Sequence, residues 1–314
     1  MASTSENPPG PMLRRRLGRT GQVVSAIGLG GYHLGLIPGA EAIRIVQEAV
    51  DHGIDFMDNC WDYNGGRSEE LMGAALAGPR REKVFLMSKV DGRTEASARG
   101  QLEQSLRRLA TDVIDLVQIH EVIRMDDAER VFAPDGAIAA LLDAKKAGKL
   151  RYLGFTGHKD PAMFNHMLDV ARQNGFAFDT VQLPLNVMDP HFKSFEANVL
   201  PRLVRDDIGV LGMKPFGAGQ ILRSGVVSAD ECLRYSLSLP ASVVITGCDS
   251  MAILQQALTI GGSFTPMSEA EKHALLARTR PHAESGQFEG WKTTHEFDGT
   301  MQNPHWLVEA RIRE

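Results

Sequence analysis

The stretch Val113-Ile114-Asp115-Leu116-Val117-Gln118-Ile119-His120 contains the pattern on which the fold depends. Its apolar, partly β-branched run predicts a strand that is buried on both faces, as in a parallel sheet. A helical pattern follows over residues 137–146, and Gly148 comes shortly after it, as is common where helices end. One strand and one helix therefore form a single repeating unit.

The same unit recurs along the chain. Strands are expected at Val24–Leu29, Ile54–Met57, Val84–Ser88, Val113–Ile119, Leu150–Phe155, Thr180–Leu183, Ile208–Gly212 and Ser242–Ile245. Helices are expected at Ala40–Asp51, Arg67–Ala77, Glu95–Leu109, Ala137–Lys146, Pro161–Ala171, Ser194–Val204, Ala229–Ser238 and Ser250–Thr259. Eight strands that alternate with eight helices predict an α/β fold, a closed (β/α)8 TIM barrel.

The 314 residues are compatible with two domains or with one barrel of roughly 250 residues. No linker divides the chain, so we expect one barrel domain over residues 13–314, preceded by a disordered leader over residues 1–12. An N-terminal hairpin at 13–23 is expected to plug the bottom of the barrel. A C-terminal tail over about 261–314, with a helix at Ser268–Arg280, is expected to cap the mouth.

Composition excludes several classes of protein. The formal charge of −5 argues against a nucleic-acid or anionic-membrane partner, since both require a basic surface. Cys60, Cys232 and Cys248 are odd in number and widely spaced, without a CxxC pair, which argues against a disulfide framework or a structural zinc site, and no metal ligands are expected. Without a secretory signal or a long apolar run, the chain is expected to be cytoplasmic. Its oligomeric state is not predicted.

Polar residues follow three adjacent predicted strands. Asp58 ends the second strand, Tyr63 follows in its loop, Lys89 ends the third and His120 ends the fourth. Because reactive groups of such barrels lie at the carboxyl ends of the strands, these four side chains are expected to converge. An ammonium next to a phenol is expected to lower its pKa, and a carboxylate would hold the ammonium in place.

This set suits acid–base chemistry at a carbonyl. Tyr63 would exchange the proton, Lys89 and Asp58 would assist it, and His120 would orient the substrate oxygen. The hydride would have to come from a cofactor, because no side chain can supply one. Taken singly, each residue has an ordinary structural explanation, such as a helix cap or packing. The four positions together favour catalysis.

Several motifs resemble those of the aldo-keto reductase superfamily. Gly53-Ile54-Asp55-Phe56-Met57-Asp58, with Tyr63 and the later Ser68-Glu69-Glu70 and Gly73, is similar to its first signature. Met87-Ser88-Lys89, Leu116–His120, Leu17–Gly21 and Ile27–Gly31 are also similar. The likeness covers about residues 13–260. It implies a catalytic tetrad of Asp58, Tyr63, Lys89 and His120, and an oxidoreductase that reduces an aldehyde or ketone, or oxidises an alcohol.

The resemblance also implies a nicotinamide dinucleotide bound across the barrel mouth, without a Rossmann glycine fingerprint. Gln182 would contact the nicotinamide amide, and Met213 stands where many members stack an aromatic ring. Backbone amides of glycine-rich loops can hold phosphates, although Gly217 and Gly219 also suit a simple tight turn. The implied cofactor-binding set is Gly30, Gly31, Thr156, His158, Gln182, Met213, Lys214, Gly217, Gly219, Gly247 and Cys248.

The chain departs from the family pattern at two cofactor loops. Thr156-Gly157-His158 stands where many members have a Ser-Asn pair. The phosphate-binding Lys and Arg of NADP-dependent members are replaced around Gly247, Cys248 and Ile253. Lys214, Arg223 or Gln256 are possible substitutes. NADP(H) is favoured on the habit of the family, and NAD(H) is possible.

Aromatic side chains are the candidates for a substrate pocket, which would hold a small carbonyl or alcohol. They are Tyr32, Trp61, Trp291 and Phe297, each of which could equally serve packing. Two alternatives remain open. One is a metal-dependent hydrolase on the same barrel, with ligands from Asp58, Lys89 (if carbamylated) and His120. The other is a cofactor-binding regulatory protein without catalysis.

Overall fold

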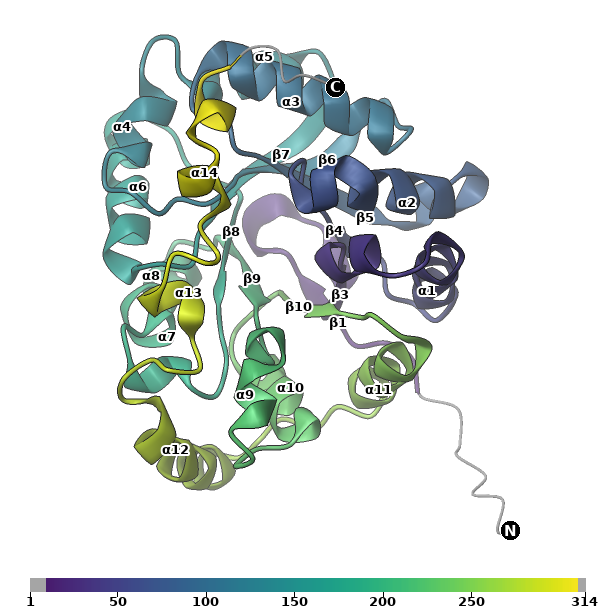
Figure 1. Cartoon of the computed structure of the whole chain (residues 1–314), viewed down its shortest axis with the longest axis vertical. Helices are drawn as coiled ribbons and strands as arrows, with labels where there is room; N and C mark the ends of the chain where they lie inside the picture. The colour runs from purple at the N-terminus through teal and green to yellow at the C-terminus, as the bar shows by residue number, and fades with distance from the viewer. Residues whose placement is uncertain (1–9, 310–314) are drawn as a thin grey trace.

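The computed structural model describes residues 10–309, whose centre is a closed barrel of eight parallel strands (Figure 1). The strands follow one another around the barrel in chain order, and the last pairs with the first. The predicted (β/α)8 barrel is therefore confirmed. Its strands are β3 (Ile27–Gly30), β4 (Phe56–Asp58), β5 (Phe85–Val90), β6 (Ile114–Ile119), β7 (Leu150–Thr156), β8 (Thr180–Pro184), β9 (Gly209–Met213) and β10 (Val243–Gly247).

The register of the strands brings their carboxyl ends to one rim. Gly30 lies opposite both Asp58 and Gly247, and Thr156 lies opposite Gln182. Apart from Gln182, each of these residues is the last of its strand. Parallel pairing in this register therefore gathers the candidate site residues at the mouth of the barrel.

Helices surround the barrel, and several begin at side-chain caps. Thr94 accepts from the amide of Ser97 at α3, and Asp160 accepts from Ala162 at α6. The surrounding helices are α1 (Gly39–Asp51), α2 (Arg67–Ala75), α3 (Glu95–Arg108), α4 (Asp127–Phe132), α5 (Ala137–Lys146), α6 (Pro161–Gln173), α7 (Phe195–Asn198), α8 (Leu200–Arg205), α9 (Gln220–Arg223), α10 (Ala229–Ser238) and α11 (Met251–Gly262).

The predicted hairpin is present as β1 (Arg14–Arg16) and β2 (Val23–Ser25), paired antiparallel. Leu17 in its turn is fully buried and packs with Phe56, Phe85 and Leu211 in the lower interior of the barrel. The amide of Arg19 donates to the carbonyl of Asp207, just before β9 begins. The hairpin therefore fills the end of the barrel opposite the mouth.

The chain differs from the sequence prediction at several places, among them α4 and α9, which were not expected. The run expected over Val24–Leu29 is divided at Ala26, because β2 belongs to the hairpin and β3 to the barrel. The helix expected over Ser194–Val204 breaks at Val199, since Pro201 has no amide to continue a helix. Of the expected leader, residues 1–9 lie outside the described residues, and Met12 packs against the core.

The C-terminal tail forms α12 (Glu269–Ala283), α13 (Gly290–Thr293), α14 (Gly299–Gln302) and the 3-10 turn η7 (Pro304–Leu307). It crosses the mouth side of the barrel and ends near α3 (Figure 1). Along this path it contacts the loops that follow β9, β7, β6 and β5. None of the described helices is long and apolar enough to cross a membrane.

Candidate active site

The ammonium of Lys89, at the carboxyl end of β5, joins three of the predicted site groups. It donates to Oδ1 of Asp58, to the carbonyl of Asn59 over 2.7 Å and to the hydroxyl of Tyr63 over 3.2 Å. An ammonium has three donors and no acceptor, so these bonds occupy all of its hydrogen-bonding capacity. Lys89 is 1% exposed, which makes its pairing with Asp58 a buried ion pair.

Asp58 has a second partner at the rim. Its Oδ2 accepts a hydrogen bond of 2.9 Å from Nε2 of Gln182, in the middle of β8. The other polar atom of that amide, Oε1, is buried and has no hydrogen-bond partner among residues 10–309. A buried unpaired acceptor is costly, so this oxygen is well suited to accept from a ligand. The donor group of a nicotinamide amide fits that requirement.

The phenol of Tyr63 lies at the start of the 3-10 turn η3 (Tyr63–Gly66). Its ring is 5.9 Å from that of His120 and 5.3 Å from that of Tyr32, both in edge contact. Burial raises the pKa of Tyr63 well above its usual value, and Asp58 adds to the increase. The expectation that Lys89 would lower this pKa is therefore wrong for the protein without ligands, and the phenol stays protonated.

His120 lies at the end of β6 among acidic groups and a thiol. Its Nδ1 is 2.8 Å from Oδ1 of Asp91, 3.3 Å from Sγ of Cys60 and 3.6 Å from Oδ1 of Asp62. Burial lowers the pKa of His120, although Asp62 and Glu121 oppose that change. At neutral pH the ring is neutral, and its Nδ1 faces a crowded polar cluster.

The carboxyl groups of this cluster are desolvated. Burial raises the pKa of Asp62 to about 7, with Asp91 contributing, and it raises the pKa of Asp91 to about 8, with Glu121 contributing. Burial also raises the pKa of the Cys60 thiol. Oδ1 of Asp62 and Oδ2 of Asp91 are buried without a hydrogen-bond partner in the described part of the chain.

Arg93, which the sequence analysis did not identify, holds this rim together. Its side chain is fully buried and pairs with Asp127 over 2.8 Å. It also donates to the main-chain carbonyls of Asp91, His120 and Glu121. Only its place two residues after Asp91, in a loop beyond a predicted strand, could have marked it. One guanidinium thus fixes the loops that follow β5 and β6.

Lys214, just after β9, lies in the mouth between the barrel and the tail. Its ammonium is 5.2 Å from the ring centre of Trp291 and 5.0 Å from that of Phe297. Burial lowers the pKa of Lys214 to about 8, and the charge of Lys89 adds to this effect. No carboxylate of the described residues forms an ion pair with it. Lys214 is therefore a cation available to an anionic group.

His158, from the loop after β7, is tied to the tail. Its Nε2 is 3.1 Å from Oδ1 of Asp298, and Lys159 and His295 contact Oδ2 of the same carboxylate. These three partners lower the pKa of Asp298 although burial opposes them. Burial lowers the pKa of His158 itself. The side chain of His158 therefore fastens the tail to the rim.

The remaining cofactor candidates lie around the same rim. Gly217 (φ 56°) and Gly219 (φ 83°) form a tight turn, and a Cβ on Gly217 would meet Ile221 and Trp291. A Cβ on Gly247 would lie 2.1 Å from Nδ1 of His33. The other candidates are buried or half-buried at strand ends: Gly30, Gly31, Thr156, Met213 and Cys248. Their predicted contacts with a cofactor stay predictions.

The four aromatic candidates lie in different surroundings. Tyr32 is 48% exposed beside Tyr63, whereas Trp291 is fully buried and Phe297 half-buried over Lys214. Trp61 is buried, donates from Nε1 to Gln104 over 2.7 Å and packs edge-on against Trp306. Tyr32 and Phe297 are thus open to a ligand, while Trp61 lies between α3 and the tail.

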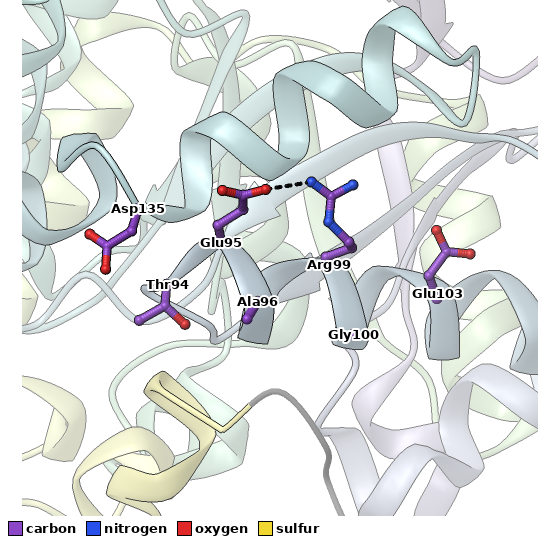
Figure 2. A pocket seen from close by; sticks show the side chains of 7 residues that line it. All are labelled: Thr94, Glu95, Ala96, Arg99, Gly100, Glu103 and Asp135. Carbon is purple, nitrogen blue, oxygen red and sulfur yellow. Dashed lines mark hydrogen bonds and ion pairs between the residues drawn. The ribbon is translucent and has the colours of Figure 1, made fainter.

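A separate hollow lies on the outside of α3, far from these groups. Its lining includes the exposed ion pair between Glu95 and Arg99, as Figure 2 shows. None of the predicted site residues contributes to it. The candidate active site is therefore the group of residues at the mouth of the barrel.

Comparisons with known proteins identify similar sequences. Residues 26–261 match the model of the Aldo/keto reductase family. The chain is 31% identical over 254 residues to 6-dehydroglucose reductase of Novosphingobium aromaticivorans, covering 74% of this chain and 78% of that protein. It is 30% identical over 224 residues to the uncharacterized oxidoreductase YrpG of Bacillus subtilis, covering 65% of this chain and 66% of that one.

Solved structures show the same fold. Aldo-keto reductase AKR11C1 from Bacillus halodurans, in its holo form, superimposes with a TM-score of 0.71 at 23% identity. The match covers 85% of this chain and 96% of that one. At such low identity, this likeness concerns the fold alone.

Proposed function

Because the chain belongs to the aldo/keto reductase family, an oxidoreductase family, we propose that it reduces an aldehyde or ketone with Tyr63 as proton donor. A bound nicotinamide dinucleotide would supply the hydride. The observation that carries the proposal is that one ammonium group, that of Lys89, donates hydrogen bonds both to the carboxylate of Asp58 and to the hydroxyl of Tyr63.

The direction of the bond between Lys89 and Tyr63 matters for the chemistry. Lys89 can only donate, so the hydroxyl oxygen of Tyr63 accepts and its own proton is free for another acceptor. A carbonyl oxygen in the mouth would receive that proton as negative charge develops on it. The ammonium then stabilises the phenolate that is left. Asp58 keeps Lys89 in position throughout. In the oxidative direction the phenolate acts as base.

His120 and Tyr32 line the space beside the phenol. The ring of His120 makes edge contact with Tyr63, and its lowered pKa leaves it neutral at pH 7. The neutral ring has one N–H group, which can donate a hydrogen bond to the substrate oxygen. Tyr32 covers the other side with an exposed ring. We therefore place the substrate carbonyl between Tyr63 and His120.

Gln182 and the glycine-rich turns are the proposed cofactor contacts. The unpaired Oε1 of Gln182 suits the nicotinamide amide, and Lys214 offers a positive charge to a phosphate or an anionic substrate group. We retain NADP(H) as the preferred cofactor, with NAD(H) as the competing one. The sequence from Gly247 to Glu271 contains no Lys, Arg or His, so a 2′-phosphate would require a cation from elsewhere in the mouth.

The decisive experiment compares wild type with Tyr63→Phe. We expect carbonyl reduction to fall at least roughly 100-fold, while NADPH binding, followed by its fluorescence, stays within a few-fold. Tyr152→Phe is the matched control, because Tyr152 lies in the lower barrel and its hydroxyl hydrogen-bonds with Gln22 and Thr20, away from the mouth. An active Tyr63→Phe enzyme would exclude this tyrosine as the donor.

Side-by-side titrations with NADPH and NADH, followed by a panel of aldehydes, ketones and sugars, identify the cofactor and the substrate class. A sugar-derived aldehyde is a sensible first member, since one relative is named 6-dehydroglucose reductase. Absence of binding to either dinucleotide would exclude the reductase and leave a scaffold without this chemistry. A hydrolytic activity that is lost on chelation would favour the hydrolase alternative, although the ammonium of Lys89 uses all three of its donors and does not suit a carbamate ligand.

A further inference from the structure

We propose that Cys60, Asp62, Asp91 and His120 form a binding site for a Zn²⁺-type transition-metal ion. One potential ligand atom from each of the four lies within 4.8 Å of all the others. The set supplies one sulfur, one imidazole nitrogen and two carboxylate oxygens, which are the donors that zinc takes in proteins. This site does not depend on the proposed carbonyl reduction.

The spacing of the ligand atoms is close to that of a tetrahedral site. Zinc bonds of about 2.0–2.3 Å place neighbouring ligand atoms about 3.3–3.8 Å apart. Nδ1 of His120 is 3.3 Å from Sγ of Cys60 and 3.6 Å from Oδ1 of Asp62. It is 2.8 Å from Oδ1 of Asp91, a hydrogen bond that the metal would replace. Side-chain shifts of about 1 Å close the widest gap.

The cluster contains acceptors that nothing in the described chain satisfies. Asp91 is fully buried, and its Oδ2 has no hydrogen-bond partner. Oδ1 of Asp62 is also buried and unpartnered. The nearby cations are engaged elsewhere, because Lys89 holds Asp58 and Arg93 holds Asp127. Two buried carboxyl groups thus lie close together, and a bound divalent cation would offset the cost of burying their charges.

Binding of the ion depends on access to the ligands and on the loss of a proton from the thiol. The side chains of His120 and Asp62 are 10% and 14% exposed, so solvent reaches these two residues, whereas Cys60 and Asp91 are fully buried. Binding requires the thiol of Cys60 to lose its proton, and affinity therefore rises with pH. A metal on Nδ1 of neutral His120 leaves the ring proton on Nε2.

Cobalt offers a direct test because a thiolate–Co²⁺ bond gives a near-ultraviolet charge-transfer band. We expect the full-length protein, stripped with a chelator, to bind about one Co²⁺ per chain with that band. Zn²⁺ should displace the cobalt and abolish the band. Cys60→Ser should lose the band, whereas Cys232→Ser and Cys248→Ser, which change buried thiols elsewhere, should keep it.

Asp91→Asn provides the second variant, because it leaves Cys60 and the thiolate signal in place. We expect its Zn²⁺ affinity, measured by competition with a chromophoric chelator, to fall at least roughly 10-fold. Far-ultraviolet circular dichroism confirms that each variant is folded. No charge-transfer band in the wild-type protein, or a band that persists in folded Cys60→Ser, would overturn the site. Neither result bears on carbonyl reduction.

Discussion

Lys89 donates a hydrogen bond to the hydroxyl of Tyr63 over 3.2 Å, and the same ammonium lies 4.7 Å from the centre of the tyrosine ring. Within the proposed function, this contact fixes the direction of proton transfer. Burial, with the charge of Asp58 adding to it, raises the pKa of the phenol and keeps it protonated, so Lys89 is the charge that stabilises the product phenolate.

Replacing Lys89 by Met should lower kcat for carbonyl reduction by roughly 10²–10⁴-fold, because the phenolate loses its counter-charge. Steady-state kinetics measure the change. Lys146→Met, at a side chain 80% exposed, is the control. Asp58 is left buried and unpaired, which costs about 3–5 kcal/mol of stability, so denaturant curves must accompany the kinetics. Activity within a few-fold of wild type in folded Lys89→Met would refute the role.

Gln182→Leu should weaken binding of the preferred dinucleotide by about 10-fold, equivalent to roughly 1.4 kcal/mol. The reason is the loss of the Oε1 acceptor at the rim. Fluorescence titration gives the dissociation constant. Gln118→Leu is a matched control, since Gln118 is also buried, also has an unpaired Oε1 and bonds Thr180 lower in the barrel. Equal weakening in both variants would contradict a specific contact.

Arg93→Met should destabilise the fold by about 3–5 kcal/mol, because Asp127 would keep a buried charge without its partner. Three main-chain carbonyls would also lose their donor. Urea unfolding measures the difference. Arg99→Met, which removes an exposed ion pair with Glu95, should change stability by less than about 1 kcal/mol. Similar losses of stability in both variants would show that the buried ion pair of Arg93 contributes no more than the exposed pair of Arg99.

The attachment of the tail should weaken in acid. The pKa of Asp298 is lower in the folded chain than its unfolded value of about 3.9. Its contribution to stability is therefore present above that value and is lost as pH falls below it. Hydrogen exchange over residues 290–303 should accelerate between about pH 5 and pH 3 relative to α6. Asp298→Asn should remove this dependence, and Asp143→Asn, at an exposed carboxylate, should preserve it.

Much of the barrel could be predicted from sequence because each strand and helix has a recognisable local pattern of residues. Buried parallel strands are continuous apolar runs, and the helices between them carry one apolar face. The convergence of Asp58 and Lys89 followed from the same reasoning, since parallel strands place their ends at one rim. The structure confirms that these two residues and Tyr63 lie in contact.

Other features depend on contacts that no local pattern encodes. Arg93 is buried only because carbonyls from two loops and Asp127 converge on it. The tail after residue 280 has no clear helical periodicity in sequence, yet it docks through Asp298 and through Glu121, whose carboxylate accepts from the amides of Gly299 and Thr300. The raised pKa of Tyr63 likewise reflects its burial in the folded chain, which a local sequence pattern does not show.

The three tryptophans of the chain all belong to the contact between the tail and the barrel. Trp291 and Trp306 are in the tail, and Trp61 packs edge-on against Trp306. The intrinsic tryptophan fluorescence of the protein therefore reports on this one contact and is not an average over the whole molecule. An unfolding curve recorded by tryptophan fluorescence would follow detachment of the tail, whereas the barrel itself needs a backbone signal such as circular dichroism.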